Sequence, residues 1–382
     1  MNFLLIAAVG LLSFANGAND NFKGVATLWG ADRTTYKRAL AWATVFTFLG
    51  SLVAIWAGGG LAAKFSGAKL VGKEIYTQMP FLAAVALAAA GTVLLASRLG
   101  LPISTTHALT GALVGAGVTA AGFAHVKFAA LASGVVLPLL FSPIVSLALT
   151  MAICPLIAKL ATGRDCVCVD QPQSVVIAAP STSATAVLIV PPAVRWAPAT
   201  QCRTGVEAVR FSITDGVHWL SGAGISFARG LNDTPKITAV LLLAAASAVR
   251  LDYTLVAVAM AVGAALGAAR VARTMSKKIT PMAVPEAVGA NLVAAALVTL
   301  ASCFALPVST THVTSGGLFG IGLLRRREAN WKQVRDILLS WVGTLPIGAS
   351  LAAMFYLLLK QRLFTAVGFQ FVVGLMFVSR HS

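Results

Sequence analysis

Two short stretches with almost the same sequence decide the fold. Residues 101–107 read LPISTTH and residues 306–312 read LPVSTTH, a spacing of 205 residues from 104 to 309. A second matching pair, GANDNFK at 17–23 and GLNDTPK at 230–236, is spaced by 213 residues from 20 to 233. Because both motifs occur in the same order in both halves of the chain, they indicate an internal duplication.

Each LPxSTTH stretch places a proline and four polar residues between two apolar helical segments of about 17 to 20 residues, each near the length that spans a bilayer. A proline disfavours helix in the residue before it, so a sharp turn is more natural here than two full crossings. We therefore expect a re-entrant helical hairpin with its tip near the middle of the membrane. A hairpin that does not cross leaves each half with an odd number of crossings, so the halves are inverted relative to each other.

The composition excludes a soluble enzyme. Of the 382 residues, 58% are hydrophobic and 11% are charged, whereas soluble chains carry about 25% charged residues. Bilayer-length apolar runs cover residues 39–62, 128–158, 253–269, 337–359 and 363–379. We predict an all-α polytopic protein of the plasma (bacterial inner) membrane with two inverted-topology repeats, each containing a broken helix and a re-entrant hairpin.

The chain divides at a proline-rich centre. Residues 161–209 hold five prolines and read as a cytoplasmic linker between a first membrane repeat, 1–160, and a second, 210–360. Residues 361–382 form a C-terminal hydrophobic segment and tail. Within the linker, the β-type runs 174–178 and 186–190 favour a small hairpin.

The net charge of +17 comes largely from clusters between apolar runs, at residues 33–38, 270–278 and 325–335. Such clusters are typical of cytoplasmic loops and place the N-terminus outside. Nucleic-acid binding is not expected, because no basic run alternates with aromatic residues that could stack on bases.

The five cysteines do not form a recognisable framework. Cys154 and Cys303 lie in apolar runs and are interpreted as packing residues. Cys166, Cys168 and Cys202 lie in the linker, where a C-x-C pair without a second pair supports a metal site only weakly. We expect no cofactor.

The two STTH tetrads are candidate anion receptors. A helix that begins at membrane depth has unpaired N–H groups and a positive dipole end, and hydroxyl groups on the same turn add donors. Two such ends facing each other could surround a tetrahedral oxyanion. The alternative is that these hydroxyls cap the helices or bond to carbonyls one turn back. The histidines that follow could donate to the anion or only to carbonyls. The residues concerned are Ser104, Thr105, Thr106, His107, Ser309, Thr310, Thr311 and His312.

The duplicated Asn-Asp pairs, Asn19-Asp20 and Asn232-Asp233, are candidate ligands for a coupling cation. A charged residue at the centre of a membrane helix costs roughly 2.5–3.5 kcal/mol on insertion scales and is usually functional. The alternative is an inert ion pair with Lys23 or Lys236, one helical turn away. Arg98 and Arg229 could help to hold an anion or could extend to the interface.

These motifs together resemble the inorganic phosphate transporter (PiT) family of cation-coupled phosphate permeases. The matching stretches are 17–20, 231–235, both P-[IV]-S-T-T-H hairpins, and 331–346. The resemblance implies a symporter that imports phosphate, coupled to H⁺ or Na⁺, by alternating access around a midplane site. It implies that phosphate lies between the hairpin tips and the broken helices, that Asp20 and Asp233 are metal ligands if the coupling ion is Na⁺, and that the protein is a homodimer in the lipid bilayer.

One departure from the family pattern concerns the coupling ion. The family has small or amide residues after its first motif, whereas this chain has Phe22 and Lys23, and Lys236 stands at the equivalent place in the second half. We hypothesise that these ammonium groups tune or replace a cation site, which favours H⁺ over Na⁺.

Two other functions remain as alternatives. Sulfate is also tetrahedral, but an ionised aspartate at the site favours phosphate, which carries a proton at neutral pH. An enzyme would need a nucleophile, a base and a third orienting group, and the repeat symmetry favours transport instead.

Overall fold

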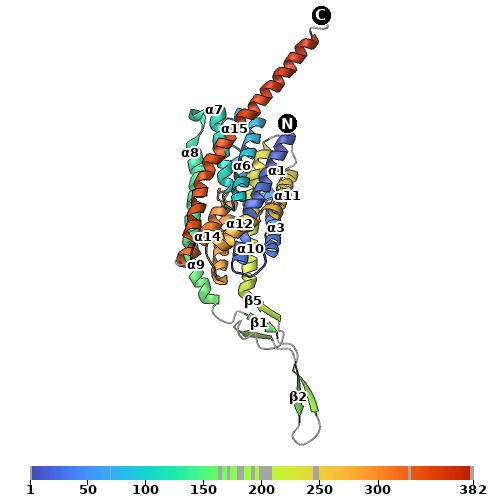
Figure 1. Ribbon diagram of the computed structural model, residues 1–382, viewed down its shortest axis with the longest axis vertical. Helices are drawn as coiled ribbons and strands as arrows, with labels where there is room; N and C mark the ends of the chain where they lie inside the picture. The colour runs from blue at the N-terminus through green and yellow to red at the C-terminus, as the bar shows by residue number, and fades with distance from the viewer. Residues whose placement is uncertain are drawn as a thin grey trace.

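The computed structural model describes residues 2–68, 70–161, 166–169, 173–178, 185–190, 194–197, 209–243, 249–325 and 328–378, with side chains to residue 361. It is a bundle of long helices with β-strands at one end (Figure 1). Seven helical segments of the described chain are long and apolar enough to cross a membrane. The predicted multi-pass helical protein is therefore confirmed.

In the described part of the first half, two long helices come before the helical hairpin that contains LPISTTH, and one comes after it. The elements of this half are α1 (Asn2–Asp20), the 3-10 helix η1 (Asn21–Val25), α2 (Ala26–Gly30), α3 (Tyr36–Ala57), α4 (Gly59–Phe65), α5 (Lys73–Tyr76), α6 (Met79–Leu99), α7 (Thr105–Ala121), η2 (Phe123–His125), α8 (Phe128–Leu131), the π-helix η3 (Ala132–Val136) and α9 (Leu137–Ala161).

The second half, as far as it is described, has five long helices in the same order as α1, α3, α6, α7 and α9, with different short helices between them. Its elements are α10 (Ile213–Leu242), α11 (Val249–Gly267), α12 (Ala269–Arg273), the π-helix η5 (Thr274–Lys278), α13 (Val284–Cys303), α14 (Thr310–Leu324) and α15 (Trp331–Val378). The predicted runs 337–359 and 363–379 both fall on α15, which is continuous to Val378.

The two Asn-Asp motifs differ in local structure. In the first half α1 ends at Asp20 and a 3-10 helix follows, so the predicted break is present. In the second half α10 continues through Asn232, Asp233 and Pro235, so the prediction of a broken helix is wrong there. Proline removes one backbone hydrogen bond but has a helical φ, which allows a helix packed on all sides to continue across it.

The two hairpins meet at their tips. In the first, Gly100 ends α6 with a left-handed φ of 70°; in the second, Ala305 has a φ of 51°. The imidazole rings of His107 and His312, each in the first turn after a tip, have centroids 4.4 Å apart. Figure 1 shows α7 at the end of the bundle where α8 lies, whereas α14 lies toward the opposite end.

Glycines allow the halves to interlock. Gly17 of α1 and Gly263 of α11 each lie against the other helix's backbone, and Gly50 of α3 and Gly230 of α10 do the same. Any Cβ at these four positions would meet backbone atoms of the facing helix. Small residues are what membrane helices use to approach closely, so these contacts fix the first helix of each half against the second helix of the other.

The linker contains short antiparallel strands. β2 (Gln173–Ala178) pairs with β3 (Thr185–Val190), which confirms the predicted hairpin. β1 (Cys166–Val169) pairs with both β4 (Val194–Ala197) and β5 (Val209–Ser212), a sheet that was not predicted. Cys202 lies outside the described residues. Among those described, no three His, Cys, Asp or Glu residues are grouped to hold a metal.

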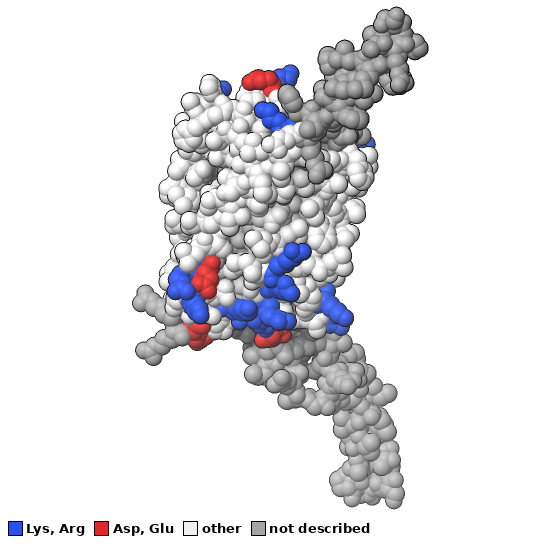
Figure 2. Space-filling view, turned by 45° about the horizontal axis from the view of Figure 1, so that its top comes forward, with Lys and Arg blue, Asp and Glu red and all other residues white. Residues whose placement is uncertain are grey.

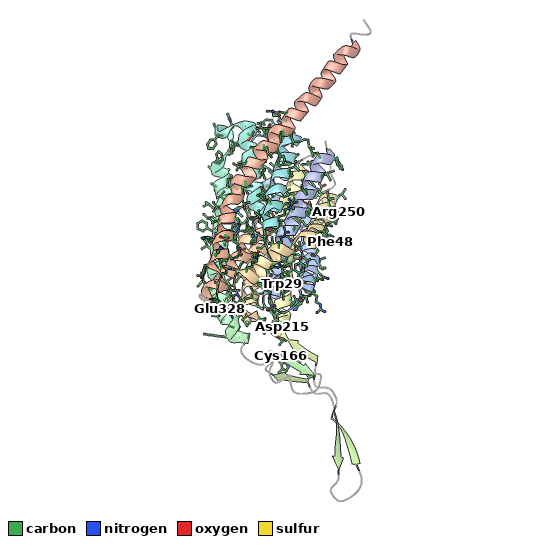
Figure 3. All side chains as sticks on the ribbon, viewed as in Figure 1. Trp29, Phe48, Cys166, Asp215, Arg250 and Glu328 are labelled. Atoms are coloured by element: carbon green, nitrogen blue, oxygen red, sulfur yellow. The ribbon has the colours of Figure 1, made fainter. Side chains whose placement is uncertain are left out.

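Basic residues gather at the linker end of the molecule (Figure 2). Three ion pairs there join segments that are far apart in the sequence: Lys277 with Asp32, Arg33 with Asp215, and Arg325 with Glu286. Figure 3 places Asp215 and Glu328 at this end. The distribution agrees with the cytoplasmic side assigned from the sequence.

The glycine contacts yield a stability prediction. Gly263→Val should lower the melting temperature of the purified protein in detergent, because overpacking costs about 1–3 kcal/mol or more. Gly10→Val is the control, since nothing lies within 4 Å of a Cβ at Gly10. Equal melting temperatures for the two variants would contradict the close packing.

Candidate functional site

A buried polar cluster forms where η1 and the middle of α10 meet the first turns of α7 and α14. It contains five charged side chains, all at most 5% exposed: Asp20, Lys23, Arg229, Asp233 and Lys236. The LPxSTTH turns and the Asn-Asp motifs therefore come together, although each pair is separated by about 70 to 85 residues. The family resemblance implied a site between these same segments.

Lys23 connects the two halves of the protein. Its ammonium donates to Asp20, to Asn19 Oδ1 at 2.8 Å and to the Ile103 carbonyl at 2.8 Å, all in the first half. It also donates to Thr311 Oγ1 at 2.6 Å, which belongs to the second hairpin. One ammonium thus links the broken helix to both hairpin tips.

Lys236 makes the equivalent set of contacts from the other side. Its ammonium lies 3.5 Å from Asp233 Oδ1 and donates to the Val308 carbonyl at 2.7 Å, both in the second half. It also donates to Thr106 Oγ1 of the first hairpin at 3.0 Å. Each lysine therefore pairs with the aspartate and hairpin carbonyl of its own half and with a threonine of the opposite half.

The remaining threonines bind the carboxylates. Thr105 Oγ1 donates to Asp20 Oδ2 at 2.7 Å, and Thr310 Oγ1 lies 3.4 Å from Asp233 Oδ2. Asn16 Nδ2 donates to Asp20 Oδ2 at 2.8 Å and lies 3.4 Å from Asp233 Oδ2, so it joins the two carboxylates. Donors thus surround both aspartates within the described structure.

The two serines act as helix caps, the alternative that the sequence left open. Ser104 Oγ accepts from the His107 N–H and Ser309 Oγ accepts from the His312 N–H, both at 3.2 Å. An N-cap stabilises a helix start by satisfying one of its unpaired donors. The serines therefore shape the tips, and the threonines supply the hydroxyl groups that face the charged residues.

The asparagines of the Asn-Asp motifs hold the hairpin tips. Asn19 Nδ2 donates to Ser97 Oγ and to the Leu101 carbonyl, each at 3.0 Å. Asn232 Nδ2 donates to the Val308 carbonyl at 3.2 Å, and Ser302 Oγ donates to Asn232 Oδ1 at 3.3 Å. These contacts position the tips against α1 and α10, so both amide groups are engaged by protein groups.

The histidines lie beside this cluster. His312 Nδ1 is 3.1 Å from the Leu139 carbonyl, and its ring packs on Trp341 with centroids 4.0 Å apart. Trp341 in turn donates to the Pro102 carbonyl at 3.0 Å. The sequence left open whether the histidines contact an anion or only carbonyl groups, and the contact observed for His312 is with a carbonyl. In the described part of the chain, neither imidazole bonds to Asp20 or Asp233.

The two candidate arginines have different positions. Arg229 enters the cluster: its Nε lies 3.6 Å from Asp233 Oδ2, and its Nη1 donates to Asn21 Oδ1 at 3.0 Å. Arg98 is exposed at the end of α6, where its carbonyl accepts from Arg270. Arg98 is therefore not part of the buried site.

Asn16 and Asn21 were not identified from the sequence. Asn16 accepts from Arg229, and it stands 213 residues before it, at the equivalent place in the duplication. The repeat spacing could have identified Asn16 because its partner position carries a charge. The two halves are therefore not equivalent: the first has the neutral amide of Asn16 where the second has the guanidinium of Arg229.

The charges of the cluster leave one excess positive charge. Lys23, Arg229 and Lys236 are three cations, against the two carboxylates Asp20 and Asp233. Unbalanced charge is costly in a low-dielectric interior. The excess, together with N–H and O–H donors on two helix starts, makes the cluster suited to an oxyanion.

A multi-pass helical bundle with such a buried cluster has the features of a membrane transporter for an anion. Residues 16–352 match the model of the phosphate transporter family, and the chain belongs to this family. It is therefore a phosphate transporter of the plasma membrane and not an enzyme.

Similar proteins have been described in bacteria and archaea. The chain is 27% identical over 380 residues to a "Probable low-affinity inorganic phosphate transporter" of Bacillus subtilis, covering 94% of this chain and 98% of the relative. It is 28% identical over 402 residues to a "Putative phosphate permease" of Thermococcus kodakarensis, covering 93% of this chain and 97% of the relative. A solved structure titled "The sodium-dependent phosphate transporter" has the same fold, with a TM-score of 0.65 and 20% identity, covering 94% of this chain and 99% of that chain.

The buried ion pairs yield a prediction. Lys23→Met should destabilise the protein by about 3–5 kcal/mol, because it leaves Asp20 buried without its counter-charge. The double variant Lys23→Met with Asp20→Asn should recover much of this loss. Thermal unfolding in detergent measures both.

The control for this prediction is Lys277→Met. Lys277 pairs with Asp32, whose side chain is 82% exposed, and exposed pairs contribute only about 0–1 kcal/mol. A double variant that is less stable than Lys23→Met alone would show that the charge pairing is not what Lys23 provides.

Proposed function

We propose that this transporter is a symporter that imports inorganic phosphate across the plasma membrane by alternating access around the buried cluster. The observation that carries the proposal is the reciprocal contact of the two lysines. Lys23 donates to Thr311 and Lys236 donates to Thr106, so a positive group from each half faces the hairpin of the other. Relative movement of the halves would change both contacts together.

Phosphate binds, in this proposal, between the starts of α7 and α14. The hydroxyl groups of Thr106 and Thr311 exchange a lysine partner for a phosphate oxygen, and the lysines follow the anion as counter-charges. The N–H groups at both helix starts add donors. Thr105 and Thr310 keep the two carboxylates oriented, and Ser104 and Ser309 cap the helices.

The proposed coupling ion is H⁺. Protonation of Asp20 or Asp233 would remove the counter-charge of a lysine and free its ammonium for phosphate. A sodium ion would instead compete with Lys23 and Lys236 for the same carboxylate oxygens. The solved relative is titled sodium-dependent, which leaves Na⁺ as the alternative, with Asp20 and Asp233 as the metal ligands.

A coupled cation has an energetic purpose. Moving a negative charge into a cell with an inside-negative potential costs roughly 2.3 kcal/mol per charge per 100 mV. Each proton that enters with phosphate offsets one charge.

Inverted repeats are the proposed basis for alternating access. Two observations support them. Helix α1 packs on α11 while α10 packs on α3, and α7 packs on α15 while α14 packs on α9, so exchange of the halves reproduces the same pairings. The hairpin tips also touch while their outer ends lie toward opposite ends of the bundle (Figure 1).

Sulfate remains the alternative substrate, and the family match favours phosphate over it. The homodimer implied by the family resemblance stays a prediction.

Reconstituted protein tests substrate and coupling ion together. Proteoliposomes with an imposed inward proton gradient should accumulate labelled phosphate, and replacing external Na⁺ with K⁺ should not change the rate. Arsenate should compete and sulfate should compete weakly. Accumulation that needs a Na⁺ gradient and ignores the pH gradient would refute proton coupling, and stronger uptake of sulfate would refute the substrate.

The carboxylates are tested by neutral variants. Asp20→Asn and Asp233→Asn should each lower accumulation against a gradient by at least ten-fold, because an amide cannot take up the coupling proton. Asp32→Asn, at an exposed ion pair, should match the parent. Accumulation that survives both site variants would exclude these carboxylates from coupling.

A further inference from the structure

A cavity of about 220 Å³ lies in the first half, one helical turn beyond the buried cluster. Its lining includes Lys64 and Phe65 of α4, Thr110 of α7, and Ser133 of η3. One water needs only about 10–15 Å³ by this measure, so the cavity can take a small anion with part of its hydration shell.

The cavity faces the side opposite the basic loops. Thr110 follows Thr106 by one turn, and its hydroxyl donates to the Thr106 carbonyl at 2.8 Å. From there α7 continues toward α8 at the end of the bundle away from the linker (Figure 1). Ser133 of η3, which also lines the cavity, is exposed, and the charge distribution assigns this end of the bundle as the outside.

The Phe65 ring lies at the cavity and beside the buried cluster. Phe65 is 2% exposed and lines the cavity, and its ring centroid lies 5.8 Å from Lys236 Nζ. An ammonium over an aromatic ring is attracted by the ring's negative face. The same lysine donates to Thr106, so Phe65 contacts both the cavity and the lysine of the proposed phosphate site.

Helix α4, which carries Phe65, is short and bounded by glycines. Residues 58–60 are all glycine, and Gly67 after the helix has a left-handed φ of 79°. Gly58 lies against Pro235, and Gly60 lies against Ala305 at the second hairpin tip. Any shift of α10 or of that tip would therefore be passed to α4 and its phenylalanine.

The equivalent place in the second half is filled. Ser315 is the repeat partner of Thr110, and its hydroxyl lies 3.8 Å from the sulfur of Met275. Met275, in η5, is 1% exposed. The corresponding inner position is thus packed by Met275, whereas the outer position holds a cavity.

Lys64 supplies the charge that an anion needs. It lines the cavity, and among the described residues it has no ion-pair or hydrogen-bond partner. Thr110 and Ser133 add hydroxyl groups, although both already donate to carbonyls one turn back.

We propose that this cavity is an outer vestibule in which phosphate binds beside Lys64 before it reaches the buried site, and that Phe65 is the gate between the two. The proposal rests on the phosphate-transport function given above. Lys64 attracts the anion, and movement of α4 withdraws the ring from Lys236, which exposes the ammonium to the entering anion.

Cysteine labelling tests the vestibule. In a background with all five cysteines replaced, Thr110→Cys should react with a membrane-impermeant thiol reagent added outside right-side-out vesicles, and inorganic phosphate should slow the reaction. Thr110 and Ser315 are both buried, but only Thr110 borders the cavity; Ser315→Cys, packed against Met275, is the matched control and should not react from outside. Absent labelling of Thr110→Cys, or labelling that phosphate does not slow, would overturn the vestibule.

Lys64 is tested in the same assay. Lys64→Gln should raise the phosphate concentration that half-protects Thr110→Cys by at least three-fold, and should raise the KM for uptake with little change in kcat. Lys64→Arg should restore both values. An unchanged half-protecting concentration would remove Lys64 from the proposal.

The gate is tested by Thr106→Cys, which should react from outside faster when Phe65→Ala is also present, because the ring then no longer has to withdraw before the reagent can enter. Equal reaction with and without Phe65→Ala would overturn the gate. Phosphate uptake by the cysteine-free parent is measured first: absent uptake there would count against the proposed function, whereas normal uptake with unprotected labelling would count only against the vestibule.

Discussion

The reciprocal pairing of two buried lysines holds the centre of this protein together. Lys23 and Lys236 are each neutralised by an aspartate of their own half, and each donates to a threonine of the other half. A buried ammonium without such partners would be strongly unfavourable. The hairpin tips and the Asn-Asp segments must therefore stay in register for the charges to remain satisfied. At the same time, each lysine contacts the opposite threonine through a single hydrogen bond, which an anion with oxygen acceptors could replace.

The surrounding fold brings these groups together by close helix packing. Glycines at the α1–α11 and α3–α10 crossings let backbones touch, and Asn19 and Asn232 tie the hairpin tips to α1 and α10. The apolar clusters lie around this polar centre, on both sides of it. The central cluster is thus held by closely packed helices, and α4, which carries Phe65, is the element that the proposed gate requires to move.

Much of this arrangement follows from the sequence because the duplication is visible there. The repeated LPxSTTH and Asn-Asp motifs identify the residues of the site, and the family resemblance implies a site between the hairpin tips and the Asn-Asp segments; the contacts of Thr105 with Asp20 and of Thr310 with Asp233 come from the structure. What the motifs lack is the pairing between halves: Lys23 and Thr311 are 288 residues apart, and no local pattern links them. The capping role of Ser104 and Ser309 depends on backbone geometry, which the sequence left open. The continuity of α10 through Pro235 depends on tertiary packing, and the exposure of Arg98 depends on the orientation of the last turn of α6.

The central claim is that phosphate takes the place of the contacts between each lysine and the opposite threonine. A structure of the purified protein in lipid nanodiscs with saturating phosphate tests it most directly. Tetrahedral density within hydrogen-bond distance of the Thr106 and Thr311 hydroxyl groups, with both lysine ammonium groups turned toward it, is the expected result. Phosphate density elsewhere, with the contacts Lys23–Thr311 and Lys236–Thr106 intact, would contradict the claim.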